Sequence, residues 1–168
     1  MKPLQGAQAR DKVLGLEAAK RAVARARRQG ETIVFTNGCF DLLHPGHVRS
    51  LEAAARHGGR LIVAVNHDAS VRRLKGPGRP IQSARARKEV VAALACVDWV
   101  VGFSADTPLR TIQALRPDVL AKGGDWQIDE IVGRDEIGGW GGRVVRLPLF
   151  AGHSTTLTIE KLDQTRDR

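Results

Sequence analysis

The chain has 168 residues, of which 42% are hydrophobic, and its 27 lysines and arginines against 18 acidic residues give a formal charge of +9. This length suits one domain with a proper core. The sequence contains neither an apolar run of about 18 residues nor a hydrophobic leader at its N-terminus. Membrane-spanning and secreted proteins are therefore not expected, and we predict a cytoplasmic protein with no membrane partner.

The N-terminal segment, residues 1–30, holds much of the positive charge in one helical stretch. Basic and apolar residues share this stretch at helical spacing, which predicts an amphipathic helix packed on a single domain of residues 31–168. A nucleic-acid-binding surface is the alternative, but the chain has no Tyr and few aromatics for base stacking, so no nucleic-acid partner is expected. The apolar residues of the expected buried side are Val13, Leu16, Ala19, Val23 and Ala26.

The first expected strand, residues 32–36, leads into the most informative segment of the chain. The strand is β-branched and apolar, as buried parallel strands are, and the Asn-Gly dipeptide at 37–38 breaks it at a sharp turn. Pro45 suits the first turn of a helix. The free N–H groups and the positive dipole end of that helix predict an anion-binding site between His44 and His47.

The two histidines strengthen this prediction. His44 and His47 lie three residues apart, so on a helix their rings share one side, and Gly46 lets a ligand approach the backbone closely. The pair can hold two phosphate oxygens. A lone histidine is more often a cap or a packed side chain, whereas two around a glycine at a strand-to-helix turn favour a ligand site. A zinc site is less favoured, because no Cys or carboxylate cluster in the sequence supplies the remaining ligands.

Apolar runs and helical segments alternate along the rest of the chain. The alternation predicts an α/β fold, a Rossmann-like doubly wound sheet of five parallel strands with helices on both faces and a ligand across the carboxyl ends of the strands. Cys39 and Cys96 are far apart in sequence, and no disulfide is expected. The later strands are expected at 61–65, 99–103, 119–121 and 144–147, and the helices at 47–57, 69–73, 84–95, 107–115, around 129–137 and from 154 onward.

A second phosphate-binding device is expected in residues 74–80. Two glycines and two prolines form a loop there that carries Lys75 and Arg79 toward the same space. Lys75 supplies a mobile point charge and Arg79 a forked one, so together they can hold a sugar phosphate against the α-phosphate of a nucleotide. A solvated surface turn explains the residues of this loop equally well.

Two later segments carry glycines and polar side chains that can approach a ligand. Residues 122–126 follow a short strand, so their glycines allow close approach, and Asp125 can accept a hydrogen bond from a ribose or a base. The Ser-Thr-Thr of residues 154–156 is a helix start with hydroxyl caps. The chain has neither a GxxxxGK[ST] loop nor a GxGxxG turn, so phosphate binding needs devices other than those two fingerprints.

The segment from Gly38 to His47 resembles the signature of the HxGH nucleotidyltransferase superfamily, in its cytidylyltransferase-like branch. In glycerol-phosphate cytidylyltransferases an Arg-Thr-Glu-Gly segment precedes the Ser-Thr-Thr, whereas this chain has the apolar segment 149–152, which argues against cytidylyl transfer to glycerol phosphate. The domain occurs in its family alone or as the C-terminal half of a kinase–adenylyltransferase, and this chain is too short to include the kinase half. Segments 63–66, 74–80, 97–101, 122–126 and 152–156 resemble blocks of bacterial heptose 1-phosphate adenylyltransferases.

The resemblance implies transfer of AMP from ATP to D-glycero-β-D-manno-heptose 1-phosphate, giving ADP-heptose and pyrophosphate for the inner core of lipopolysaccharide. It also implies Mg²⁺ brought by the ATP phosphates, with no metal held by the protein alone, a homodimer, and a separate heptose kinase in the same pathway. Two alternatives stay open. One is AMP or CMP transfer to another phosphorylated acceptor, such as glycerol 3-phosphate or phosphopantetheine, and the other is a non-catalytic nucleotide- or nucleic-acid-binding module.

Roles for individual residues follow from the same resemblance. Catalysis is expected from His44, His47 and Lys75, and sugar-phosphate binding from Asp41, Lys75 and Arg79. The residues expected to bind the nucleotide are Asn37, Gly38, Phe40, Gly46, Arg87, Lys122, Gly124, Asp125, Ser154, Thr155 and Thr156.

Overall fold

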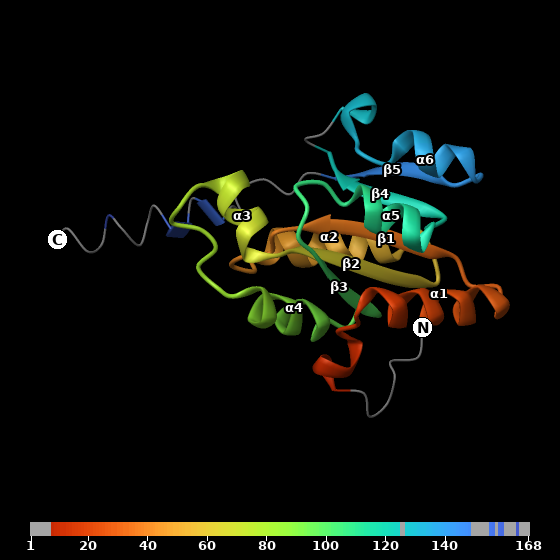
Figure 1. Ribbon diagram of the computed structural model, residues 1–168, viewed down its shortest axis with the longest axis horizontal. Coiled ribbons are helices and arrows are strands. Elements are labelled where there is room, and N and C mark those ends of the chain that lie inside the picture. The colour runs from red at the N-terminus through yellow and green to blue at the C-terminus, as the bar shows by residue number, and fades with distance from the viewer. Residues whose placement is uncertain (1–7, 125–126, 149–154, 157, 160–163, 165–168) are drawn as a thin grey trace.

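The computed structural model describes residues 8–124, 127–148, 155–156, 158–159 and 164. Within these residues, five parallel strands form one sheet in the order β3-β2-β1-β4-β5, with helices packed around it (Figure 1). The five-stranded parallel α/β fold predicted from the alternation of strands and helices is confirmed. The strands are β1 (Ile33–Gly38), β2 (Arg60–Asn66), β3 (Trp99–Phe103), β4 (Val119–Gly123) and β5 (Arg143–Leu147).

Helices cover both faces of the sheet because the strands are apolar on both faces. Along β1, Val34 packs in a core with residues of α2 and α4, whereas Ile33 and Phe35 pack on the other face with residues of α1, α5 and α6. This alternation is the two-residue period of a strand that is buried on both sides. The helices are α1 (Leu16–Arg28), α2 (Pro45–Ala55), α3 (Asp68–Lys75), α4 (Ala84–Ala92), α5 (Leu109–Leu115) and α6 (Arg134–Gly139), with short turns η1 (Ala9–Lys12) and η2 (Ile128–Glu130).

The strand order reverses at β1. From β1 the chain moves outward through β2 to β3, and it then returns to the other side of β1 to form β4 and β5. β1 pairs with β2 over six residues but with β4 over only two, at Val34 and Phe35. The reversal of strand order thus lies between β1 and β4, and the carboxyl edge at such a point is where open α/β sheets form a binding crevice.

Three local expectations differ from the structure, two of them beside the carboxyl edge of the sheet. β1 does not break at 37–38, because Asn37 and Gly38 stay in register with Ala64 and Val65 of β2. Lys75 is the last residue of α3, so the loop begins at Gly76.

The third difference concerns the predicted N-terminal helix, which begins only at Leu16, whose side chain is 40% exposed. Its buried side consists of Ala19, Ala22, Val23 and Ala26, and the small alanine side chains let the helix lie close to the sheet. Leu16 was expected on that side, but it lies in the first turn at the edge of the buried stripe. No helix in the described part of the chain is long and apolar enough to cross a membrane.

Candidate active site

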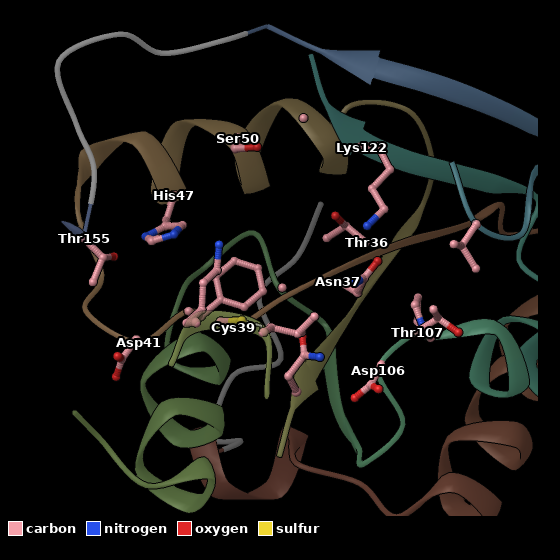
Figure 2. A pocket seen from close by; sticks show the side chains of 18 of the residues that line it. Thr36, Asn37, Cys39, Asp41, His47, Ser50, Asp106, Thr107, Lys122 and Thr155 are labelled. Atoms are coloured by element: carbon pink, nitrogen blue, oxygen red, sulfur yellow. Dashed lines mark hydrogen bonds between the residues drawn. The ribbon is translucent and has the colours of Figure 1, made fainter. Parts of the chain in front are cut away.

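A cavity of about 650 Å³ opens at the carboxyl edge of the sheet, at the reversal of strand order (Figure 2). Its walls come from the β1–α2 loop, the end of α3 and the loop after it, the β3–α5 loop, and the segment after β4. These segments are far apart in the sequence, and the parallel sheet brings them to one edge because all its strands end there.

The β1–α2 loop places the two histidines at the start of α2. His44 is the N-cap residue in extended conformation, and its Nδ1 accepts a hydrogen bond of 3.4 Å from the backbone N–H of His47. Pro45 takes the first helical position, where its missing N–H is not needed. The rings of His44 and His47 stack with their centroids 3.8 Å apart and their planes 21° from parallel. The predicted pairing of these histidines on one side of a helical turn is present in the structure.

The surroundings of His47 disfavour the charged form of its ring. Burial lowers the pKa of His47 to about 4, and the adjacent His44 contributes to this lowering. His47 is therefore neutral at pH 7 until an anion compensates the charge. Its Nδ1 is buried without a hydrogen-bond partner among the described residues, although buried polar atoms are nearly always paired. This nitrogen is available to a ligand in the cavity.

Phe40 supports His47 and explains one of the glycines. The rings of Phe40 and His47 lie 5.4 Å apart, and Phe40 has a left-handed φ of 47°. A Cβ atom at Gly38 would lie 3.0 Å from the Phe40 ring. Gly38 is thus needed because the Phe40 ring occupies the space of a side chain, and that ring in turn supports His47.

Positive charge reaches the cavity from three separate segments. Lys75 comes from the end of α3, Arg79 from the following loop, and Lys122 from β4. Arg79 donates from Nε to Asp41 Oδ2 at 2.6 Å, which leaves its two terminal nitrogens to face other partners. Together with the positive dipole end at the start of α2, these cations suit a polyphosphate.

Most residues expected at the site line this one cavity. Gly46 is instead buried in the first turn of α2, and Gly124 lies outside the cavity wall, with its carbonyl accepting from Arg146. Asp125 and Ser154 lie outside the described residues. The expected residues found in the cavity wall are Asn37, Gly38, Phe40, Asp41, His44, His47, Lys75, Arg79, Lys122, Thr155 and Thr156.

Arg87, expected to bind the nucleotide, is buried in the structure and bonded to the protein. Its side chain is 1% exposed, and the guanidinium donates to three backbone carbonyls and to the carboxylate of Asp68. The family resemblance implied a nucleotide contact for Arg87, but in the structure its donors bond to the protein itself.

Asp41, expected to bind the sugar phosphate, is also directed into the protein. Its side chain is 2% exposed, and both carboxylate oxygens accept hydrogen bonds from the loop after α3. An ionised carboxylate would moreover repel a phosphate. The structure therefore replaces the expected sugar-phosphate contact with a contact inside the protein.

Sequence reasoning missed several polar residues of the cavity. Asn66 ends β2, Asp106 and Thr107 follow β3, and Glu130 follows β4. All stand at or after the ends of strands of the sheet, so their positions at the carboxyl edge were a signal that could have found them. In Figure 2, Asp106 and Thr107 lie across the cavity from His47 and Thr155.

Asn37, near the middle of the cavity in Figure 2, carries a second open hydrogen-bonding atom. Its Oδ1 is buried and has no partner in the described structure. This oxygen is an acceptor, so it can take a hydrogen bond from a hydroxyl or amino group of a ligand.

The described residues contain no group of three His, Cys, Asp or Glu side chains that could hold a metal ion. The acidic side chains of the cavity wall are Asp41, Asp106 and Glu130, and Asp41 is already bonded to the protein.

Comparison with known proteins gives a consistent result. A family model described as cytidylyltransferase-like matches residues 35–160. Two relatives named "Bifunctional protein HldE", from Azotobacter vinelandii and Coxiella burnetii, are 57% and 56% identical over 150 residues, 89% of this chain. The match covers 32% of each relative, so the chain spans about a third of the length of these proteins.

Solved structures extend the likeness to the fold. A lipopolysaccharide core biosynthesis protein from Thermoplasma volcanium matches with a TM-score of 0.63 and 27% identity, over 72% of this chain and 99% of that chain. Pantothenate synthetase from Thermus thermophilus matches with a TM-score of 0.56 over 82% of this chain and 61% of that chain. At 18% identity, the second likeness concerns the fold alone.

Proposed function

The chain belongs to the cytidylyltransferase-like family, and on that premise we propose that it transfers AMP from ATP to D-glycero-β-D-manno-heptose 1-phosphate. The products are ADP-heptose and pyrophosphate, and their use is in building the inner core of lipopolysaccharide. The observation that carries the proposal is the stacked pair of His44 and His47 at the start of α2, in a cavity that also receives Lys75, Arg79 and Lys122.

The proposed reaction is a direct displacement. An oxygen of the sugar 1-phosphate attacks the α-phosphorus of ATP in line, a new P–O bond forms, and the bond to the bridging oxygen of the pyrophosphate breaks. No covalent intermediate with the enzyme is needed. Because two anions must meet and the leaving group must accept charge, positioning and electrostatic stabilisation supply the rate.

The histidines act as hydrogen-bond donors to phosphate oxygens. When Nδ1 of neutral His44 accepts from the His47 backbone, the ring carries its proton on Nε2. The buried ring of His47 has a lowered pKa in the free protein and gains a proton more readily once a phosphate lies beside it. Donors that strengthen as charge develops on the phosphates lower the barrier most.

The cations bring the two substrates together. Lys75 and Arg79 approach the cavity beside the β1–α2 loop, where they can bridge the sugar phosphate and the α-phosphate. Mg²⁺ would arrive with ATP, held mostly by phosphates and water, and would neutralise charge on the polyphosphate. Asp106 and Glu130 could add an oxygen ligand each, but neither is needed for this step.

The polar end of the cavity supports a sugar as the acceptor. Asp106, Thr107 and Glu130 line it, Asn37 lies nearer the middle of the cavity, and all four offer oxygen atoms that accept from hydroxyl groups. Among the described residues, Asn37 Oδ1 is the buried side-chain oxygen that lacks a partner. A sugar with many hydroxyls can donate hydrogen bonds to these oxygens.

We also propose that the protein works in the cytoplasm, where ATP and sugar phosphates are made. We propose further that it forms a homodimer and that a separate kinase supplies its heptose phosphate. The length of the HldE relatives, about three times that of the match, is compatible with a second activity being joined to this one in those proteins.

Pyrophosphate release from a panel of substrates tests the proposal. ATP and CTP are each paired with heptose 1-phosphate, glycerol 3-phosphate and phosphopantetheine, and products are identified by mass. Release only from ATP with heptose 1-phosphate supports the proposal down to its acceptor. Release with another pair would show that the substrates are that nucleotide and acceptor instead. If the folded protein binds ATP but releases no pyrophosphate with any pair, the proposal that it catalyses this transfer is contradicted.

A further inference from the structure

The loop of residues 76–82, here called the phosphate loop, lies beside the cavity with much of its surface exposed. Pro77, Gly78 and Ile81 are exposed, and Ile81 retains 55% of its accessible surface. A short exposed loop with two glycines is expected to move unless other segments hold it. Its Arg79 nevertheless faces the cavity, which raises the question of what fixes it there.

Asp41 holds the middle of the phosphate loop. Its carboxylate accepts from Arg79 Nε at 2.6 Å, from the backbone N–H of Ile81 at 2.8 Å and from that of Gln82 at 3.0 Å. Burial alone would raise the pKa of Asp41, but the hydrogen bonds from Gln82, Ile81 and Arg79 outweigh burial and hold that pKa below its usual value. The carboxylate is therefore ionised at neutral pH and accepts from all three donors.

Arg87 holds the end of the phosphate loop from the opposite side. Its Nε donates to the carbonyl of Gln82 at 2.9 Å. Its terminal nitrogens donate to the carbonyl of Cys39 in the β1–α2 loop, to the carbonyl of Asn66 at 2.8 Å and to Asp68 at 2.7 Å. One buried guanidinium thus joins the phosphate loop to the two loops that follow β1 and β2.

Burying a guanidinium costs free energy, so Arg87 is expected to make interactions that an apolar residue could not make. A fully buried arginine is tolerated only when its donors are paired, and Arg87 is the largest fully buried side chain among the described residues. A purely apolar residue would fill the space at lower cost, but it could not bond carbonyl groups at strand ends. The pairing of Arg87 with loop carbonyls indicates that its contribution is to fix these loops.

We propose that Asp41 and Arg87 are positioning residues, which clamp the phosphate loop onto the histidine-bearing β1–α2 loop and so aim Arg79 at the acceptor phosphate. Asp41 takes only Nε of Arg79 and leaves the terminal nitrogens for the phosphate. The clamp joins the parts of the site that touch the acceptor to the part that touches the α-phosphate. Neither positioning residue touches substrate itself.

This proposal rests on the proposed function for its kinetic consequence but not for its structural one. Backbone amides of Ile81 and Gln82 donate to Asp41, so their hydrogen exchange reports the clamp without any substrate. We expect Asp41→Asn to speed exchange at both amides by about tenfold or more, because the amide side chain keeps only one acceptor oxygen. The melting temperature should fall by only a few degrees.

The matched control is Asp98→Asn. Asp98 also accepts a backbone N–H, that of Leu61 at 2.8 Å, and also pairs with an arginine, but it lies at the other end of the sheet. Its substitution should leave exchange at Ile81 and Gln82 unchanged. Unchanged exchange in Asp41→Asn, or equally fast exchange in both variants, would overturn the clamp.

A double-mutant cycle with Arg79 separates positioning from a general loss of structure. Asp41→Asn should raise KM for the acceptor about tenfold while kcat changes less than about threefold, and in the Arg79→Met background the same substitution should raise KM less than about threefold. Arg87→Lys, which keeps the charge but not the fork, should shift KM the same way. Additive effects of Asp41→Asn and Arg79→Met would overturn the kinetic part.

The structural and kinetic readouts fail separately. A wild-type protein that turns over no heptose phosphate, but whose Ile81 and Gln82 amides depend on Asp41, refutes the proposed acceptor and supports the clamp. Turnover of heptose phosphate with amides that do not respond to Asp41 supports the proposed function and overturns the clamp.

Discussion

The two ends of the sheet treat their polar side chains differently. At the amino end, Asp98 accepts the backbone N–H of Leu61 at 2.8 Å and Asp118 accepts that of Ile33 at 2.7 Å. Arg60 bonds Glu31 through two nitrogens and Asp98 through a third. Every one of these side chains bonds to another part of the protein, and the strands start in fixed register as a result.

At the carboxyl end, polar groups are only partly used by the protein. Asn37 Oδ1 and His47 Nδ1 are the buried side-chain atoms that lack partners in the described part of the chain, and both belong to residues of the cavity wall. An unpaired buried polar atom costs about 1–3 kcal/mol. The protein therefore closes its hydrogen bonds where they stabilise the sheet, and it leaves some open where a ligand can complete them.

The largest expected effect on activity comes from a substitution of His47, at the carboxyl end of the sheet. His47→Ala should lower kcat by about a hundredfold or more, because it removes a donor to the transition state. Steady-state pyrophosphate release measures this loss, and thermal unfolding should stay within about 3 °C of the wild type. Near-normal turnover would refute the assigned role.

A substitution of Lys75 should come next. Lys75→Met keeps the length of the side chain but removes its charge, so we expect kcat/KM to fall about tenfold to fiftyfold. Titration of both substrates should place more of the loss on the reaction of the two phosphates than on ATP affinity. A matched change at an exposed lysine of α1, Lys20→Met, serves as the control, and an equal loss there would show a general charge effect.

At the amino end of the sheet, a substitution of a charged side chain should lower stability and leave activity unchanged. Asp98→Asn weakens the bonds to Arg60 and Leu61, and the side chains of Asp98 and Arg60 are mostly buried. We expect a loss of about 1–2 kcal/mol in the free energy of unfolding, from urea titration, with kcat/KM unchanged. A large loss of activity at wild-type stability would erase the contrast between the two ends.

The acidity of His47 gives a pH test of the same contrast. Because its pKa is about 4 in the folded protein and about 6.5 when unfolded, the unfolded chain binds more protons between these values. Stability conferred by the neutral ring is therefore present above about pH 6.5 and is lost as the pH falls toward 4. NMR titration should find the pKa of His47 near 4 in the free protein and higher with tripolyphosphate bound. A free-protein pKa of about 6.5, the ordinary value, would contradict the burial of the ring.

The smallest expected effect is at the sugar end of the cavity. Asp106 already pairs with Arg73 at an exposed position, so it contributes only part of its charge to a ligand. Asp106→Asn should raise KM for heptose 1-phosphate about threefold to fivefold and leave KM for ATP unchanged. An increase confined to ATP would assign this end of the cavity to the nucleotide.

The sequence predicted most of the fold because its signals were local. Apolar strands, Pro45 at the start of a helix, and His44 and His47 three residues apart are patterns that short-range geometry alone determines. The same local logic predicted an anion site in the β1–α2 loop. It also placed Lys75 and Arg79 near one cavity, since Lys75 directly precedes the short loop that contains Arg79.

The remainder depended on contacts between distant segments. Asp41 and the amide of Ile81 are 40 residues apart, and Arg87 and the carbonyl of Cys39 are 48 apart. Nothing in the sequence distinguishes a charged side chain that binds a ligand from one that bonds backbone groups across such a distance. Asp106 and Thr107 were missed for a simpler reason, because polar residues after a strand also occur in ordinary surface loops.

The measurement that tests the central claim most directly is ³¹P NMR of the wild-type protein with ATP, Mg²⁺ and heptose 1-phosphate. Transfer at the α-phosphorus predicts pyrophosphate together with a new pair of coupled diphosphate resonances that belong to a nucleotide sugar. Formation of ADP and a heptose bisphosphate would show transfer of the γ-phosphoryl group instead. That result, or unchanged substrates in the presence of folded protein, would contradict nucleotidyl transfer at the His44–His47 cavity.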